Sequence, residues 1–344
     1  MTRASYAVVG GGAIGGTLAF HLAKAGHPVT VVDADAEHVA AIRDDGLTIE
    51  RDGVRERVAV EAATPDEFDG PLERVLLAVK AQATESAADW IAPRLAEDGY
   101  VVSIQNGFNE SLLAERIGRP RTVAAFVNIF ADRLEPGVIA DGGAGALVLG
   151  EPGGQPVSPR VSSLVEDLRA WGPAQASDNV EGFLWAKAGF GAMLAATALA
   201  DDAMADLIDR HHPAIHALGE EVFDVASGLS IRLEAFDAFT PHAFVRGADP
   251  TARAAATDHL TAWLRTQPKT RSGIWRDLAV RRRQVEVTTH YATVLAEATR
   301  LNVATPVLRA VLDHLRDLEH DPAGMSETRL TTLDTLASEA AQVP

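Results

Sequence analysis

The chain has 344 residues, enough for two domains of ordinary size, and 47% of them are hydrophobic, which excludes a disordered chain. Its formal net charge of -17 argues against nucleic acid or an anionic membrane surface as partner, because phosphate binding needs basic patches. The absence of cysteine excludes disulfides and thiolate chemistry and fits a cytoplasmic protein. No apolar run reaches the roughly 20 residues of a membrane span, and the N-terminus leads directly into a predicted strand rather than a signal peptide.

The N-terminal segment has the pattern of a dinucleotide-binding turn. A predicted strand at Tyr6–Val9 is followed by Gly10, Gly12 and Gly15 in the spacing G-x-G-x-x-G, and a helical pattern then covers Ile14–Lys24. In this motif the first glycine allows the tight turn and the second lets the backbone approach a pyrophosphate. The third lets the helix pack closely on the strand, and the helix N-terminus faces the phosphate charge.

A second predicted strand, Val29–Val32, ends at Asp33, which stands about 20 residues after the glycines, where the motif places an acid on the ribose. A carboxylate there accepts hydrogen bonds from both ribose hydroxyls and repels a 2′-phosphate, so the sequence favours NAD(H), and NADP(H) stays possible. A glycine-rich turn in another kind of α/β protein is the alternative. The residues expected to hold the cofactor in this segment are Gly10, Gly12, Ala13, Ile14, Gly15 and Asp33.

The rest of the first half alternates strand and helix patterns, as a parallel sheet requires. Strands are predicted at 47–50, 56–60, 74–79, 100–104, 122–128 and 146–150, with helices at 36–44, 83–96 and 161–171. From about Asn179 almost every segment has a helical period: a long buried helix at 183–207 broken near Thr197, helices at 260–266 and 274–298, and a last helix or frayed tail at 330–344. We predict a doubly wound, Rossmann-type α/β domain over 1–177 and an all-α substrate and dimerisation domain over 178–344.

Two predicted parallel strands are followed at once by polar residues. These are Lys80 and Gln82 after the first strand, and Gln105 and Asn106 after the second. Each pair alone is as consistent with an ordinary polar loop as with a site. Because open α/β sheets bind ligands at the carboxyl ends of their strands, the two pairs together favour a functional role.

The sequence resembles the ketopantoate reductase family over nearly its whole length. The resemblance rests on the glycine turn and on the order and spacing of further motifs: Ala78-Val-Lys-Ala-Gln82, Ser103-Ile-Gln-Asn-Gly107, Glu135-Pro-Gly-Val138, Gly145-Ala-Leu-Val-Leu-Gly-Glu151, Trp185-Ala-Lys187, Thr197-Ala-Leu199, Ser272 through Asp277 to Glu286, and Thr305-Pro306. It implies an NAD(P)-dependent reductase of 2-oxo acids. It also implies a C-terminal domain with helices like those of 6-phosphogluconate dehydrogenase, and it makes a homodimer plausible.

The resemblance implies roles for single residues. Lys187 matches the lysine that protonates the ketone oxygen, and Glu286 matches the glutamate that holds the substrate. Asn106 matches a contact to nicotinamide and substrate, Ser272 matches a contact to the substrate carboxylate, and Lys80 and Gln82 fall in the cofactor site. No metal is expected.

Elementary chemistry agrees with the role of Lys187. Hydride delivery to a carbonyl creates an alkoxide, which a cation that also donates a proton can stabilise. Burial in the apolar run around Lys187 would lower its pKa, and a nearby acid would oppose that shift. The alternatives are a solvated lysine at this position and, for Glu286, a surface ion-pair network with the preceding Arg281–Arg283.

The chain departs from the family in the expected substrate pocket. Gly191 and Ala195 stand where the family usually has asparagines, and Arg281-Arg-Arg-Gln-Val-Glu286 replaces a G-R-P-T-E stretch. His290 and Tyr291 follow Glu286, where the family tends to have small or acidic residues. A rebuilt pocket makes ketopantoate doubtful, and a bulkier 2-oxo acid, or oxidation of a 2-hydroxy acid, is at least as well supported. His290 either assists proton transfer or is a helix-surface histidine.

The leading hypothesis is a cytoplasmic NAD-dependent oxidoreductase that interconverts a 2-oxo acid and a 2-hydroxy acid. One alternative is a true 2-dehydropantoate 2-reductase, which uses NADPH and makes pantoate for coenzyme A synthesis. The other is a non-catalytic nucleotide-sensing protein that kept the fold. Retention of Lys187 and Glu286 argues against the last.

Overall fold

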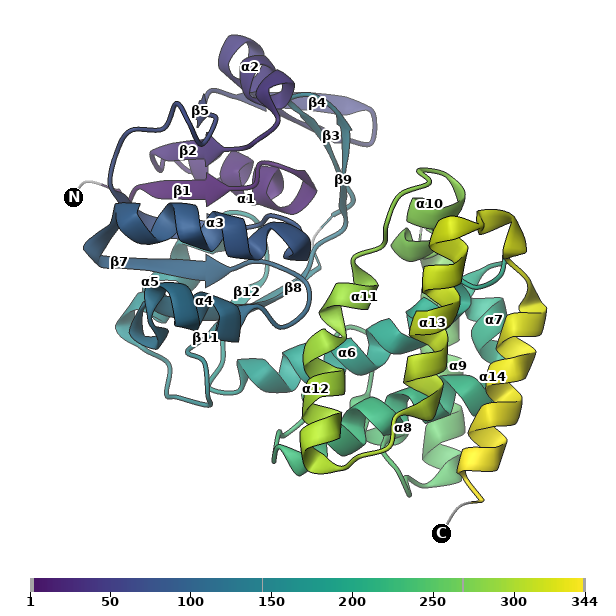
Figure 1. Cartoon of the computed structure of the whole chain (residues 1–344). Helices are drawn as coiled ribbons and strands as arrows, with labels where there is room; N and C mark the ends of the chain where they lie inside the picture. The colour runs from purple at the N-terminus through teal and green to yellow at the C-terminus, as the bar shows by residue number, and fades with distance from the viewer. Residues whose placement is uncertain (1–2, 144, 268, 343–344) are drawn as a thin grey trace. The chain divides into compact units, whose positions relative to one another are not determined.

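The computed structural model describes residues 3–143, 145–267 and 269–342. It consists of two compact units, Met1–Glu181 and Gly182–Pro344, and the expected boundary lay at 177/178. The first unit is an α/β domain and the second is helical, so the predicted fold class is confirmed (Figure 1). The last two residues of the predicted tail, 343–344, lie outside the described residues.

The first unit is built on a twisted sheet of eight strands. They are β1 (Tyr6–Val9), β2 (Val29–Val32), β5 (Glu61–Ala63), β6 (Leu72–Leu77), β7 (Leu95–Ser103), β8 (Thr122–Asn128), β11 (Ala146–Gly150) and β12 (Ala174–Ala176). Their order is β12-β11-β8-β7-β6-β1-β2-β5, and the pairs from β5 to β8 are all parallel. This is the doubly wound order, in which the switch point that receives a nucleotide lies between β1 and β6.

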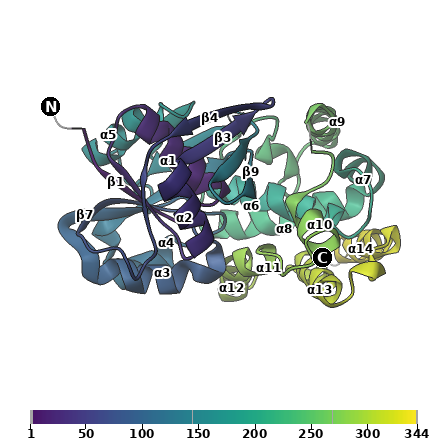
Figure 2. The ribbon, with the colours of Figure 1, turned by 90° about the horizontal axis from the view of Figure 1, so that it is seen from above.

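Helices cover both faces of this sheet, which Figure 2 shows edge-on. On one face lie α1 (Ala13–Lys24), α2 (Ala36–Asp45) and α5 (Pro159–Leu168); on the other lie α3 (Thr84–Ile91) and α4 (Glu110–Ile117). Successive side chains of β1 alternate between the two cores: Tyr6 and Val8 enter one, Ala7 and Val9 the other. A strand buried on both faces therefore has the continuous apolar sequence that predicted it.

A smaller sheet in the same unit has the order β4-β3-β10-β9. Its strands are β3 (Leu47–Arg51), β4 (Val54–Val58), β9 (Ala131–Glu135) and β10 (Val138–Asp141). The strands predicted at 47–50 and 56–60 form a hairpin around Asp52-Gly53, and the second strand begins two residues earlier than predicted. The β9–β10 hairpin was not predicted. It packs on α1 so closely that a Cβ on Gly16 would lie 2.0 Å from Cδ1 of Ile139.

One helix prediction in this unit is wrong at its end. The expected helix over 83–96 stops at Ile91, and a short 3₁₀ turn at Ala92–Arg94 leads into β7, which begins at Leu95. The helical spacing of apolar residues continues past the true end, because Leu95 also starts a strand. Further 3₁₀ turns lie at Ala81–Ala83, Arg119–Arg121, Pro241–Phe244 and Pro322–Gly324.

The second unit is a bundle around the apolar helix α6. Its helices are α6 (Val180–Thr197), α7 (Met204–Arg210), α8 (His212–Gly228), α9 (Pro250–Thr266), α10 (Gly273–Ala279), α11 (Val287–His290), α12 (Ala292–Leu301), α13 (Pro306–His320) and α14 (Glu327–Ala340). The break predicted near Thr197 is confirmed, whereas 274–298 is not continuous helix but α10, a turn, α11 and α12. Within the described residues, no helix is long and apolar enough to cross a membrane.

Candidate active site

The glycine turn has the geometry that its sequence predicts. Gly10 has φ +96°, and a Cβ there would lie 2.7 Å from the backbone N of Val79. A Cβ on Gly15 would lie 2.0 Å from the carbonyl O of Gly10, so both positions exclude side chains. A Cβ on Gly12 would meet no described atom within 4 Å. The fold thus requires Gly10 and Gly15, whereas Gly12 leaves open space at the N-terminus of α1, as a pyrophosphate needs.

Asp33 is fixed at the end of β2 by backbone N–H groups. Its Oδ2 accepts a hydrogen bond from the N–H of Gly11 at 2.7 Å, and its Oδ1 accepts one from the N–H of Asp35 at 2.9 Å. Each carboxylate oxygen has two lone pairs, so both can still accept a ribose hydroxyl. The acid is therefore held beside the turn, with lone pairs left to accept further hydrogen bonds.

Arg133 is a cation near the end of β2 that the sequence did not predict there. Oδ1 of Asp35 caps α2 by accepting from the N–H of His38 at 3.2 Å, and its Oδ2 accepts from Nη1 of Arg133 at 2.8 Å. These two bonds hold the pKa of Asp35 below its usual value. Arg133 belongs to β9, so this arginine reaches the end of β2 from nearly a hundred residues further along the chain.

Lys80, Gln82 and Asn106 are exposed at the carboxyl ends of the neighbouring strands β6 and β7. The buried side chain of Gln105 connects the loop after β7 to the loop after β6, because its Nε2 donates to the carbonyl O of Val79 at 2.9 Å. Since Val79 also touches the glycine turn, the structure brings the predicted cofactor residues of the first unit to one edge of the sheet. Gln105 was seen in the sequence but was not assigned a role.

Lys187 lies on α6 of the second unit and is half-buried. Desolvation lowers the pKa of its ammonium to about 8, and the carboxylate of Asp237 partly opposes the shift. Asp237 has φ +46° in a tight turn in which Phe236 and Phe239 exchange backbone hydrogen bonds of 3.2 and 2.8 Å. The ring of Phe190, on α6, packs 5.2 Å from that of Phe239 and fixes this turn on the helix. The sequence anticipated an opposing acid but not its identity.

Glu286 directly precedes α11, and His290 ends that helix. Nε2 of His290 lies 3.7 Å from Oε2 of Glu286. Burial, with a contribution from the charge of Lys187, lowers the pKa of His290 to about 4, so this imidazole is neutral at pH 7. The side chain of His290 is only 17% exposed, so the interpretation as an exposed helix-surface histidine is wrong.

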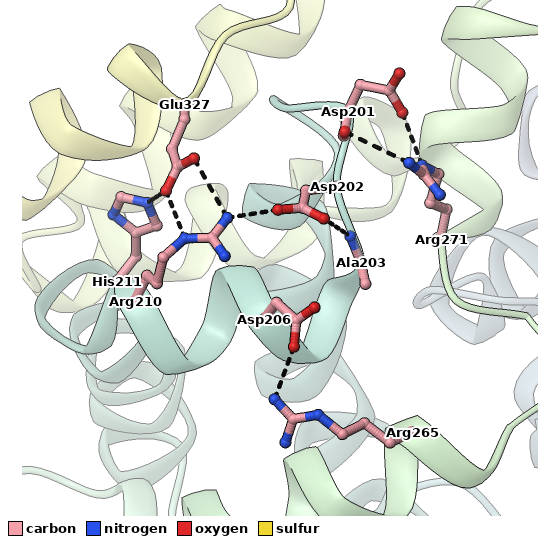
Figure 3. Close-up of polar contacts among 9 residues, drawn as sticks. All are labelled: Asp201, Asp202, Ala203, Asp206, Arg210, His211, Arg265, Arg271 and Glu327. Atoms are coloured by element: carbon pink, nitrogen blue, oxygen red, sulfur yellow. Dashed lines mark hydrogen bonds and ion pairs between the residues drawn. The ribbon is translucent and has the colours of Figure 1, made fainter.

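Ser272 is buried at the N-terminus of α10, where its Oγ accepts from the N–H of Trp275 at 3.1 Å. The preceding Arg271 donates from Nε to Oδ1 of Asp201 at 2.7 Å, within the group of ion pairs drawn in Figure 3. The same group continues through Asp202 to Arg210 and Glu327. These pairs fasten the segment before Ser272 to the α6–α7 connection, and that connection to α14.

Tyr291 occupies the space beside α6 where the sequence lacks an expected asparagine. Its hydroxyl donates to the carbonyl O of Ala188 at 2.5 Å, and a Cβ on Gly191 would lie 3.0 Å from that hydroxyl oxygen. Ala195, the second such position, is fully buried. Glycine at 191 thus leaves room for the large side chain of Tyr291. Among the described residues no group of three or more His, Asp or Glu side chains is placed to hold a metal ion.

Comparison with known proteins decides the family. Models described as "Ketopantoate reductase PanE/ApbA" and "Ketopantoate reductase PanE/ApbA C terminal" match residues 6–154 and 179–319. The chain belongs to the ketopantoate reductase family. A family relative, the 2-dehydropantoate 2-reductase of Halobacterium salinarum, is 27% identical over 319 residues, which cover 91% of this chain and 98% of that protein.

Further relatives and solved structures are similar to this chain over different lengths. The 2-dehydropantoate 2-reductase of Mesorhizobium japonicum is 32% identical over 202 residues, so the chain spans only 62% of that relative. A PanE/ApbA family ketopantoate reductase from Ralstonia eutropha superposes with a TM-score of 0.77 at 26% identity, covering 92% of this chain and 99% of that one. A D-mandelate dehydrogenase with NADH and anilino(oxo)acetate has the same fold, at 20% identity and a TM-score of 0.77, over 92% and 99% of the two chains.

Proposed function

We propose that this ketopantoate reductase family member is an NAD(P)-dependent oxidoreductase that interconverts a 2-oxo acid and a 2-hydroxy acid by hydride transfer. Family membership supports the reaction class. The observation that carries the proposal is Lys187, whose pKa is lowered to about 8 by burial. A general acid works best when its pKa lies near the working pH, so Lys187 is suited to give and to take a proton.

The chemistry divides between cofactor and protein. A nicotinamide dinucleotide, when bound, supplies or accepts the hydride at the carbon that bears the oxygen. The Lys187 ammonium protonates the ketone oxygen during reduction, and the neutral amine takes the hydroxyl proton during oxidation. Glu286 and Ser272 bind the substrate, Ser272 by donating its hydroxyl hydrogen to the carboxylate, and Asn106 binds nicotinamide and substrate. The neutral His290 adds no second positive charge beside Lys187.

We propose NAD(H) as the preferred cofactor. Asp33 is held beside the turn by two backbone N–H groups, and its negative charge would repel a 2′-phosphate. Arg133, which reaches the start of α2, is bound to Asp35. NADP(H) binding would require Arg133 to leave that carboxylate, so it is the second choice.

The first experiment is a fluorescence titration of NADH and NADPH against wild type and Asp33→Ala. We expect wild type to bind NADH more tightly and Asp33→Ala to lose that preference. Tighter binding of NADPH by wild type would overturn the assignment of NAD(H), and failure to bind either cofactor would overturn the proposed function.

A second experiment tests the reaction. Lys187→Ala should lower kcat by about 10²–10⁴-fold, the usual contribution of a general acid, and should leave the Kd for NADH unchanged. If Lys187→Ala changes turnover with none of a panel of 2-oxo acids while the cofactor still binds, the protein is the non-catalytic nucleotide sensor instead.

The substrate is proposed to be a 2-oxo acid other than ketopantoate. Gly191 stands on α6 in place of an expected asparagine, and the aromatic side chain of Tyr291 lies beside it. The alternative, 2-dehydropantoate reduction with NADPH, is favoured by the similarity to the Halobacterium enzyme over 91% of this chain. Comparing kcat/KM for ketopantoate with that for aromatic and branched 2-oxo acids decides between them. We further propose a cytoplasmic homodimer, which light scattering and cell fractionation would test.

A further inference from the structure

His38 is a fully buried histidine of α2 whose two ring nitrogens both have backbone partners. Its Nε2 lies 2.8 Å from the carbonyl O of Gly11, in the glycine turn. Its Nδ1 lies 2.9 Å from the backbone N of Gly137, between β9 and β10. One side chain therefore connects the turn at the nucleotide site, the first helix after β2, and the hairpin of the small sheet.

The partners determine the tautomer of His38. The N–H of Gly137 can only donate, so Nδ1 must accept and carries no hydrogen. The carbonyl of Gly11 can only accept, so Nε2 must carry the hydrogen and donate it. The ring is thus the neutral Nε2–H tautomer, held in one orientation by two hydrogen bonds.

The bond to Gly11 fixes the peptide plane between Gly11 and Gly12. In a planar trans peptide the C=O of one residue and the N–H of the next point in opposite directions. When His38 holds the carbonyl of Gly11 on its own side, the N–H of Gly12 is directed away from α2. A Cβ on Gly12 would meet no described atom within 4 Å, so there is space for a ligand at this residue.

Position 11 must be glycine, so its peptide has to be held by other residues. A Cβ on Gly11 would lie 2.5 Å from Cγ1 of Val31, so only glycine fits. Glycine by itself leaves the peptide free to rotate. The N–H of Gly11 is held by Asp33 at 2.7 Å and its C=O by His38, so the peptides on both sides of Gly11 along the chain are fixed.

We propose that His38 is a positioning residue of the dinucleotide site, which aims the N–H of Gly12 at the cofactor pyrophosphate. This inference rests on the proposed function, because it requires that the glycine turn binds a dinucleotide. It goes further in naming a residue outside the glycine motif that preorganises the turn. His38 touches no cofactor and is not a catalytic residue.

Two isosteric amides separate the two hydrogen bonds of His38. The side-chain N–H₂ of His38→Gln reaches about as far as Nε2 and can donate to Gly11, whereas His38→Asn reaches only as far as Nδ1 and can accept from Gly137. We expect His38→Asn to raise the Kd for NADH about three- to tenfold, the effect of one lost neutral hydrogen bond. His38→Gln should stay within about twofold of wild type.

The measurements are the Kd for NADH and, at saturating NADH, the kcat and KM for the 2-oxo acid, which should not change. A merely structural role predicts equal losses in the two variants, or losses in kcat and KM alone, and either result would overturn the proposal. Should both variants fail to fold, ¹⁵N NMR of His38 in the wild-type protein replaces them: the Nδ1–H tautomer would refute the inference. Wild type that binds no dinucleotide contradicts the proposed function instead, so the two failures are distinguishable.

Discussion

The two units prepare their functional residues in different ways. In the first unit, the glycine turn depends on backbone: Gly10 and Gly15 leave no room for a Cβ, and the N–H groups of Gly11 and Asp35 hold Asp33. In the second unit, Lys187 depends on side-chain charge and burial, with Asp237 and His290 as its electrostatic neighbours. A site of the first kind is specified by a few consecutive residues, whereas one of the second kind is specified only by the tertiary fold.

Of the substitutions that test this difference, those in the glycine turn should have the largest effects. Gly15→Ala places a methyl group 2.0 Å from the carbonyl O of Gly10, so we expect unfolding to become easier by about 1–3 kcal/mol and NADH binding to be lost. Thermal denaturation and fluorescence titration measure the two effects.

Gly12→Ala is the matched control, because in the described structure its Cβ would meet nothing within 4 Å. It should leave the melting temperature nearly unchanged and still weaken NADH binding, since the methyl group would occupy the space a pyrophosphate needs. Equal stability losses in Gly12→Ala and Gly15→Ala would show that the turn is not packed as described.

The pH dependence of the reaction tests the electrostatic site. Reduction needs the protonated lysine, so kcat/KM for a 2-oxo acid should fall as the pH rises through about 8, the pKa of Lys187. Oxidation of the 2-hydroxy acid needs the neutral amine and should rise through the same pH. The two profiles, measured with one enzyme preparation and each normalised to its maximum, should cross near that value.

Asp237→Asn should move both profiles to lower pH, because the Asp237 carboxylate raises the pKa of Lys187 against the effect of burial. A comparable surface change, Asp313→Asn, removes an exposed ion pair with Arg316 and should leave the profiles in place. A midpoint that Asp237→Asn does not move, or moves upward, would contradict the electrostatic role of Asp237.

The smallest expected effect concerns cofactor choice. Asp35→Ala releases Arg133 from its carboxylate partner and removes one negative charge near the ribose. Because the pair is partly exposed, we expect NADPH affinity to rise by only about threefold, with NADH affinity almost unchanged. Competition titrations with the two cofactors would detect this change, and Asp35→Ala/Arg133→Ala should cancel it.

The extent to which a site could be predicted from the sequence also depends on whether its residues are adjacent in the chain. The turn from Gly10 to Gly15 was readable because its glycines, strand and helix are adjacent in sequence. Arg133 was not, because it lies on an exposed strand that has no apolar pattern and meets Asp35 only after folding. An acid near Lys187 could be expected on chemical grounds, but Asp237 lies on a turn fifty residues later whose left-handed backbone no motif announces.

The contact between Tyr291 and Gly191 makes the residues at these two positions depend on each other. A side chain at position 191 would press on the Tyr291 hydroxyl, since a Cβ there lies only 3.0 Å from that oxygen. A residue larger than glycine at 191 therefore requires the Tyr291 hydroxyl to move by a few tenths of an ångström. A substitution at either position alone is therefore a poor guide to the effect of changing both together.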